Sequence, residues 1–150
     1  MREEKYVKYS ELKEAYKYVI SFFENKSGYK IESLATTISN DLGLDGDDNY
    51  YLLEEFIIKN NLNHNTFCYE EYFLTEGEIC NPSFLLKNIL ILIIRIPIFL
   101  LNLITFNKFN FKYPSFVGEE RYVKDLTIKD LITWYLEKDF KTSNQIKYIN

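Results

Sequence analysis

Cysteine is scarce in this chain of 150 residues, and the patterns of the common enzyme classes are missing. The two cysteines, Cys68 and Cys80, stand twelve residues apart, so they form neither a C-x-x-C pair nor a zinc cluster. The sequence contains no Ser-His-Asp arrangement, P-loop or dinucleotide fingerprint. Its first ten residues are charged and lack an apolar stretch, which argues against a signal peptide and favours a reducing, cytoplasmic setting.

Basic side chains are almost absent from the middle of the chain. Residues 31–82 contain 11 acidic side chains against the single basic residue Lys59, a net charge of −10, whereas residues 1–30 carry +2 and residues 83–150 carry +4. Such a block repels phosphates, so we expect no nucleic-acid partner. It suits a protein partner with a basic surface. The alternative is a solvated acidic face that only keeps the protein soluble.

Apolar residues at helical spacing predict three longer helices in what we expect to be a single domain. The first begins at Ser10 and ends near Gly28, the second spans residues 48–60, and the last runs from 127 to about 140. Residues 67–73 are predicted as a short helix or an extended aromatic segment, and the polar tail 141–150 as frayed. A long connection separates the first two helices, with four expected core anchors: Ile31, Leu34, Ile38 and Leu42.

The stretch D-L-G-L-D-G-D-D at residues 41–48 predicts a turn that leads into an acidic helix. Gly43 and Gly46 permit positive φ, and Asp47 or Asp48 can cap the helix. This stretch does not match a calcium-binding loop of the EF-hand type. The third and twelfth positions of such a loop would be Gly43 and Leu52, which have no side-chain oxygen to bind calcium. We therefore expect no metal, and we take the carboxylates around this helix as candidate partner-docking residues: Asp45, Asp47, Asp48, Glu54 and Glu55.

The same stretch resembles the D-L-G-x-D-S-L centre of an acyl carrier protein, where the serine carries the phosphopantetheine arm. Leu126 to Ile132, L-T-I-K-D-L-I, and the aromatic stretch from Phe67 to Phe73 follow in the same order as in the bacterial domain-of-unknown-function 1493 family, which has an acyl-carrier-like fold. The resemblance covers residues 31–76 and 126–140, and residues 10–25 weakly. It does not explain residues 80–125, and it implies a small acyl-carrier-protein-like four-helix bundle. We therefore expect an all-α protein in which this bundle carries an inserted apolar helical segment. We place one domain over residues 1–150 and the insertion over 83–125.

Gly46 replaces the phosphopantetheine serine of the carrier motif. The nearest serine, Ser39, lies before the turn, so we expect no phosphopantetheine attachment, no cofactor and no enzymatic activity. His64 and Cys68 stand four residues apart, and a small hydrolase built on this pair is a further hypothesis. It lacks any visible group to orient the histidine.

Residues 84–106 form an apolar segment in which 17 of 23 residues are apolar. As a helix it would be about 34 Å long, enough to cross a bilayer core of about 30 Å. Arg95 stands in its middle and Pro97 follows, where it could kink or break a helix. Three placements stay open: an anchor in the membrane interface, a true span, and a buried or dimeric core. The residues expected to meet lipid are Ile89, Ile91, Ile94, Arg95, Phe99 and Leu100.

These observations lead to one functional expectation and two alternatives. We expect an uncharacterised non-enzymatic, membrane-associated docking or accessory module at the inner face of the membrane, with a basic protein partner and with lipid bound through residues 84–106. The first alternative is an accessory component of acyl or lipid metabolism that works without a covalent arm. The second is a soluble homodimer that uses the apolar segment as its interface.

Overall fold

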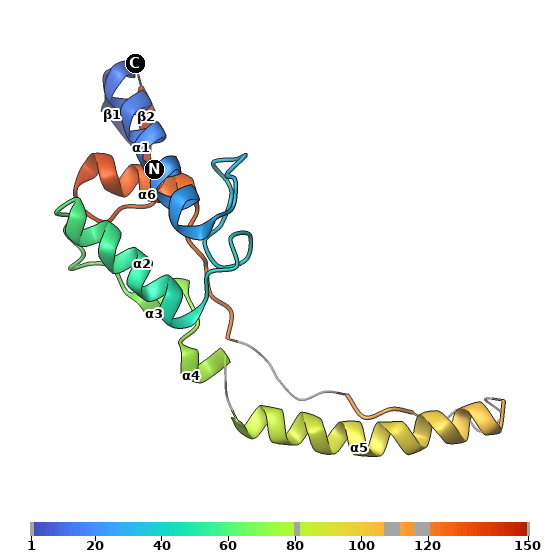
Figure 1. Ribbon diagram of the computed structural model, residues 1–150. Helices are drawn as coiled ribbons and strands as arrows, with labels where there is room; N and C mark the ends of the chain where they lie inside the picture. The colour runs from blue at the N-terminus through green and yellow to red at the C-terminus, as the bar shows by residue number, and fades with distance from the viewer. Residues whose placement is uncertain (1, 80–81, 107–111, 116–120, 150) are drawn as a thin grey trace. The chain divides into compact units, whose positions relative to one another are not determined.

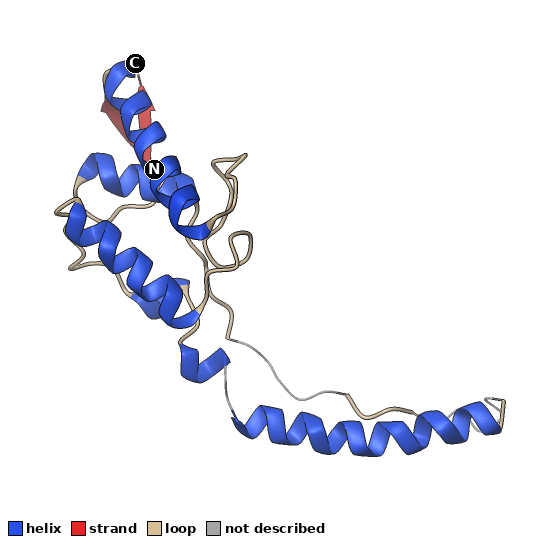
Figure 2. Cartoon of the chain, in the orientation of Figure 1, coloured by secondary structure: helices blue, strands red, loops and turns tan. Residues whose placement is uncertain are grey.

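A computed structural model describes residues 2–79, 82–106, 112–115 and 121–149 (Figure 1). The chain divides into two compact units. Unit 1 comprises Met1–Thr75 and Val123–Asn150, and unit 2 comprises Glu76–Tyr122. With 54% helix and 9% strand, the protein is mostly helical, as the sequence predicts (Figure 2).

Unit 1 contains four helices whose positions agree with the sequence pattern to within about three residues. They are α1 (Tyr9–Ser27), α2 (Gly46–Lys59), α3 (Tyr69–Tyr72) and α6 (Ile128–Glu137). Helix α1 ends where Gly28 adopts the left-handed conformation, with φ 74°. Thr127 caps α6 through two reciprocal hydrogen bonds. The Thr127 hydroxyl accepts a hydrogen bond from the Asp130 amide, and the Asp130 carboxylate accepts one from the Thr127 amide.

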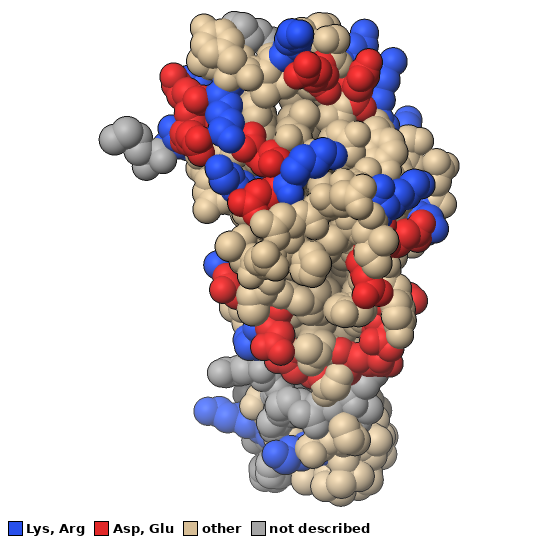
Figure 3. Space-filling model, turned by 90° about the vertical axis from the view of Figure 1, so that its left-hand side faces the viewer, with Lys and Arg blue, Asp and Glu red and all other residues tan. Residues whose placement is uncertain are grey.

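A two-stranded parallel sheet joins the two ends of unit 1, and the sequence did not predict it. Strand β1 (Glu3–Tyr6) pairs with β2 (Ile146–Ile149), with Glu3 opposite Ile146. The expectation of a frayed tail over residues 141–150 was therefore wrong, and the protein is not all-α. Ile146 is buried, which gives the tail an apolar anchor. Acidic and basic side chains are interleaved over the part of unit 1 that holds the strands (Figure 3).

The core of unit 1 is built largely from aromatic side chains. Phe22 and Phe23 of α1 meet Phe56 of α2 with ring centroids 5.3 Å apart. Trp134 of α6 is fully buried, and its indole N–H donates to the Asn63 carbonyl at 3.0 Å. Of the four expected core anchors in the long connection, Ile31, Ile38 and Leu42 are buried, whereas Leu34 is 37% exposed.

Unit 2 contains the short helix α4 (Glu76–Ile79) and the long helix α5 (Pro82–Ile104). Helix α5 continues through Pro97, so this proline does not break it. The predicted apolar segment of residues 84–106 is therefore helical over nearly all of its length. Residues 105 and 106 follow as a turn, and Phe106 has φ 49°.

Candidate functional site

The acidic helix begins two residues earlier than predicted, and this changes the role of its carboxylates. Helix α2 starts at Gly46, so Asp45 occupies the N-cap position and the expectation that Asp47 or Asp48 caps it was wrong. Gly43 and Gly46 have φ of 62° and 58°, as the sequence predicts for this turn. Asp47 and Asp48 instead lie in the first helical turn, where negative charge is stabilised by the helix dipole.

Two carboxylates hold the turn in place. Asp41 accepts hydrogen bonds from the amide of Thr37 at 2.8 Å and from its hydroxyl at 3.0 Å. The Ser39 hydroxyl donates to Asp45. Ser39, the serine nearest to the carrier position, therefore contributes to local structure.

Tyr69 of α3 packs against the start of α2. Its hydroxyl donates to the Gly46 carbonyl at 3.1 Å, and its ring lies 5.6 Å from that of Tyr50. Burial, together with the negative charges of Asp45 and Asp47, raises the pKa of Tyr69 to about 12. The tyrosine thus stays neutral near neutral pH and remains a hydrogen-bond donor to the helix start.

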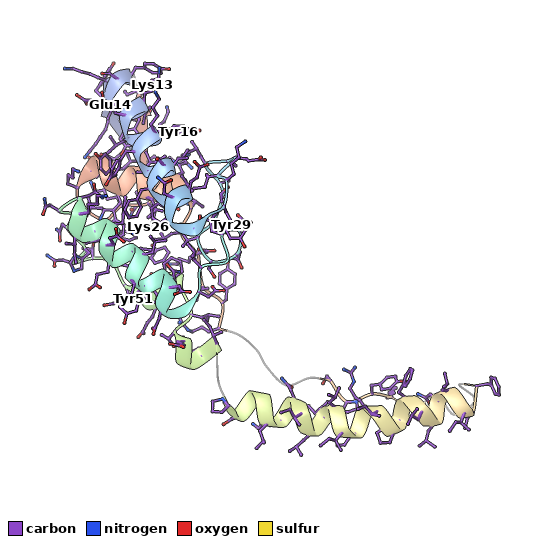
Figure 4. All side chains as sticks on the ribbon, in the orientation of Figure 1. Lys13, Glu14, Tyr16, Lys26, Tyr29 and Tyr51 are labelled. Carbon is purple, nitrogen blue, oxygen red and sulfur yellow. The ribbon has the colours of Figure 1, made fainter. Side chains whose placement is uncertain are left out.

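All five predicted docking carboxylates are exposed, and they lie along α2 or at its N-cap. Glu55 forms an ion pair with Lys26 of α1 at 2.6 Å, so part of its charge is already compensated within the protein. Figure 4 labels Lys26 on α1 and Tyr51 on α2. In the described part of the chain, Asp47, Asp48 and Glu54 form no ion pair with a basic side chain, so their negative charge is not compensated within the protein.

Two exposed apolar side chains accompany these carboxylates, and the sequence analysis missed them. Tyr51 is 62% exposed and Ile58 is 67% exposed. With Asp47 and Glu54 they recur every three or four residues, so all four lie on one outward face of α2. Their position opposite the buried Leu52, Leu53 and Phe56 could have revealed them. We name Asp47, Asp48, Tyr51, Glu54 and Ile58 the α2 stripe.

The predicted pair His64 and Cys68 lies in the connection between α2 and α3. Both side chains are exposed, and the segment is not helical at residues 64–68. The amide of Phe67 donates to the carbonyl of His64 at 3.0 Å, which fixes a turn between the two side chains. In the described part of the chain, no third side chain forms a hydrogen bond with His64 or Cys68 that could orient the histidine.

An apolar cavity of about 300 Å³ lies beside α1, α6 and β2. Its wall includes Ile132, Thr133 and Ile146, which are buried, and Leu34 lines it as well, which explains why this expected core anchor is partly exposed. Leu12 of α1, three basic residues and two tyrosines complete the lining, which contains no carboxylate: Arg2, Lys129, Lys147, Tyr16 and Tyr148.

Helix α5 exposes apolar side chains along most of its length. Leu86–Ile104 has a mean hydropathy of 2.0, and only 6% of it is buried, so it is long and apolar enough to cross a membrane. Among the residues predicted to meet lipid, Ile91 and Arg95 are half-buried within unit 2. The other four are about half exposed: Ile89, Ile94, Phe99 and Leu100.

Three polar residues of α5 share one face. Asn88, Arg95 and Asn102 are spaced by seven residues, which places them along one line of the helix. Asn102 donates to the hydroxyl of Tyr113 at 3.2 Å, and the Arg95 guanidinium lies 5.6 Å from the centre of the Tyr113 ring. Tyr113 thus covers this polar line in the part of the chain that returns from α5.

The two ends of unit 2 are tied to each other, and so are the residues of unit 1 that flank it. Within unit 2, Arg121 forms a bidentate ion pair with Glu78 at 2.9 and 3.1 Å. Within unit 1, the Lys124 amide donates to the carbonyl of Glu71, and the amide of the next residue donates to that of Tyr72, both at 3.1 Å. The chain therefore leaves and re-enters unit 1 at the same place.

The comparisons with known proteins add no relative. The chain matches no protein-family model, no curated protein and no solved structure. The resemblance to acyl carrier proteins therefore rests on the three sequence blocks and stays a prediction. In the residues that the structure describes, no group of three or more His, Cys, Asp or Glu side chains is placed to hold a metal ion.

Proposed function

We propose that this protein is a non-enzymatic, membrane-associated docking module. The observation that carries the proposal is the 19-residue apolar stretch of α5, exposed over almost its whole length. Such a surface is too large to be left in water in a soluble monomer. The surrounding sequence fits an anionic membrane surface, because residues 79–118 contain no Asp or Glu and four basic residues: Lys87, Arg95, Lys108 and Lys112.

We place α5 in the interface at the inner face of the membrane and not across it. A single crossing would put residues 71–72 and 124–125 on opposite sides of the bilayer, yet backbone hydrogen bonds join them. The ion pair between Glu78 and Arg121 supports the same conclusion for the ends of unit 2. An interfacial helix buries its apolar face to about 5–10 Å and needs no crossing.

Membrane fractionation with an alkaline carbonate wash tests this attachment. We expect the full-length chain to pellet with membranes and a chain lacking residues 84–106 to be soluble. A full-length chain that stays soluble and sediments as a dimer would contradict the proposal and would assign α5 to a homodimer interface.

The α2 stripe is the proposed docking surface for a basic protein partner. It combines exposed carboxylates with Tyr51 and Ile58, which provide an apolar centre of the kind that interfaces use. Charge complementarity would speed association and select basic partners. A partner helix with alternating basic and apolar residues fits this composition best.

Charge reversal tests the docking surface, with membrane-bound protein as bait for crosslinked partners. The double variant Asp47→Lys, Glu54→Lys should lose capture, and Tyr51→Ala should weaken it about tenfold or more, as truncating an aromatic anchor does. Glu14→Lys on α1 is the matched control and should retain capture. Capture that survives the double variant would remove α2 from the interface.

We propose further that unit 1 is an acyl-carrier-like four-helix bundle. In support, its helices follow the expected order, with a long first helix, a long connection, an acidic second helix, a short third helix and a final helix that packs on the first. Gly46 stands at the expected serine position and contributes only backbone to the helix start. Intact mass after treatment with coenzyme A and a broad-specificity transferase should show no gain.

The cavity beside α6 favours a second candidate function, an accessory role in acyl or lipid metabolism. An apolar wall with basic side chains at the lining suits a small amphiphile with a carboxylate. Titration with decanoate, followed by chemical shifts of Ile132 and Ile146, tests it. Saturable shifts that vanish on Ile132→Trp would support this role, and no shift at saturating decanoate would exclude it.

A further inference from the structure

Helix α5 has one partly covered face and one bare face. The side chains that are half-buried or buried recur every three or four residues: Asn88, Ile91, Arg95, Ile98, Asn102 and Thr105. We name these six the α5 seam. The residues on the opposite side of the helix are all 48–71% exposed: Leu86, Ile89, Ile93, Ile96, Leu100 and Ile104. All polar residues among these twelve lie in the seam, so the helix is amphipathic despite its high hydropathy.

The chain that covers the seam cannot enter the acyl layer. Residues 112–115 form no helix or strand, and Tyr113 holds them against Arg95 and Asn102. Irregular backbone exposed to hydrocarbon leaves amides and carbonyls without hydrogen-bond partners, which is strongly unfavourable because no water is present to replace them. The side of α5 that carries this segment must therefore face headgroups and water.

We propose that α5 lies in the plane of an anionic membrane with its seam toward the headgroups and its bare face in the acyl chains, and that Arg95 binds a lipid phosphate there. This inference rests on the membrane attachment proposed above and adds an orientation and a lipid class. Tyr113 positions the guanidinium at one side. Lys87, about 12 Å away along the helix axis, and Lys112, next to Tyr113 in the sequence, add positive charge to the same segment. Arginine suits this role because its planar fork matches phosphate oxygens.

The lining around Arg95 provides space for such a group. A shallow cavity of about 260 Å³ is bordered by Arg95, Phe99 and Tyr113, and by Ile96, which stands at the edge of the bare face nearest to Arg95. The cavity therefore lies at the boundary between the seam and the bare face. Aromatic rings at headgroup level are typical of membrane-interface sites. The guanidinium sits at the level where lipid phosphates lie if the bare face is immersed.

Site-directed fluorescence on the full-length chain tests the orientation. In a Cys68→Ser, Cys80→Ser background, an environment-sensitive dye is attached after Ile93→Cys or Leu100→Cys on the bare face, and after Ile91→Cys or Ile98→Cys in the seam. Vesicles of phosphatidylcholine with phosphatidylglycerol are added, with nitroxide on the acyl chains or iodide in the water as quencher. Bare-face dyes should be quenched by the chain nitroxide, and seam dyes by iodide.

The outcomes separate this inference from the membrane proposal. Equal quenching at all four positions would overturn the orientation while leaving membrane attachment intact, as expected for a span or a helix pair inside the bilayer. Absence of binding to any vesicle would overturn both.

Arg95 is tested by affinity for the same vesicles. Arg95→Gln should weaken binding to the anionic vesicles about fivefold, the effect of one basic residue near a charged surface, and leave binding to pure phosphatidylcholine unchanged. Arg95→Lys keeps the charge but loses the planar fork, so it should recover only part of the lost affinity, and Lys17→Gln in unit 1 should retain all of it. An Arg95→Gln chain with unaltered preference for anionic vesicles would remove Arg95 from the lipid site.

Discussion

Asp125 shows how one side chain can hold the connection that precedes the acidic helix. The residue is 7% exposed, and its carboxylate accepts hydrogen bonds from the amides of Ser39 at 3.2 Å, Asn40 at 3.0 Å and Leu126 at 2.8 Å. It also accepts from the Asn40 side chain at 3.0 Å. Asp125 has a φ of 56°, which aspartate tolerates better than most residues.

We expect Asp125→Ala to lower the free energy of unfolding by about 3 kcal/mol, because it leaves buried amides without an acceptor. Asp125→Asn keeps one acceptor and the tolerance of positive φ, so it should cost about half as much. Urea unfolding followed by circular dichroism measures both. Equal stability of the alanine variant and the original chain would show that water replaces the carboxylate.

Tyr69 makes the stability of the folded protein depend on pH in the alkaline range. Its pKa is raised to about 12 in the folded state, mainly by burial, whereas an unfolded tyrosine titrates near pH 10. The folded state therefore gains stability that is fully present below about pH 10 and is lost as the pH rises toward 12. Tyr69→Phe should show a smaller loss of stability between pH 9 and pH 11.5 in urea titrations. Parallel losses in both proteins would contradict this assignment.

Single residues were the least predictable part of the chain. The helical spacing of apolar residues predicts an apolar stripe of Leu52, Leu53, Phe56 and Ile57 on α2. The first three are buried and Ile57 is half-buried, because hydrophobic burial follows the helical period. The cap of the same helix was misplaced, because Asp45 and Asp47 are chemically equal candidates and only the backbone decides between them.

At the scale of elements, the β1–β2 pair depends on ionic contacts around Glu137 at the end of α6. The Glu137 side chain is 7% exposed and forms ion pairs with Lys5 and Lys141. It also accepts a hydrogen bond from the Tyr148 hydroxyl at 3.2 Å. The hydrogen bond with Glu137 is the main cause of a raised Lys5 pKa, and burial together with the charge of Glu137 raises that of Tyr148.

We expect Glu137→Gln to loosen this sheet by about 1–3 kcal/mol. The cost falls below that of a fully buried pair, because Lys5 and Lys141 are about one-third exposed and can turn to water. Amide hydrogen exchange should speed up in β1 and β2, including the Glu3 amide that donates to the Gln145 carbonyl, and stay unchanged in α2. Uniform acceleration throughout unit 1 would instead indicate global destabilisation.

Helices were predictable from this sequence and the strands were not. Helices α1, α2, α5 and α6 each repeat apolar residues over ten or more positions, so their helical periodicity can be recognised in the sequence. Strands β1 and β2 have four residues each and lie at opposite ends of the chain. Their pairing depends on tertiary contacts that no local pattern encodes.

At the scale of the whole molecule, unit 1 should fold without unit 2. Residues 71–72 and 124–125 are joined by backbone hydrogen bonds, so a short Gly/Ser linker can replace residues 76–122. We expect equal stability or a gain of up to about 1.5 kcal/mol, because closing a shorter loop costs less entropy. Urea unfolding of the shortened and full-length chains measures this. An unfolded shortened chain would show that unit 1 requires unit 2.

The pairing of β1 with β2 can form only after α5 has been synthesised. Residues 3–6 are made before α5, whereas their partners at 146–149 are made after it. The apolar helix α5 emerges between these two moments, when α6 and β2 are still missing from unit 1. A nascent chain therefore presents α5 to its surroundings before unit 1 can complete its fold. Early capture of this helix by a lipid surface would hide it during the interval in which partly folded chains aggregate.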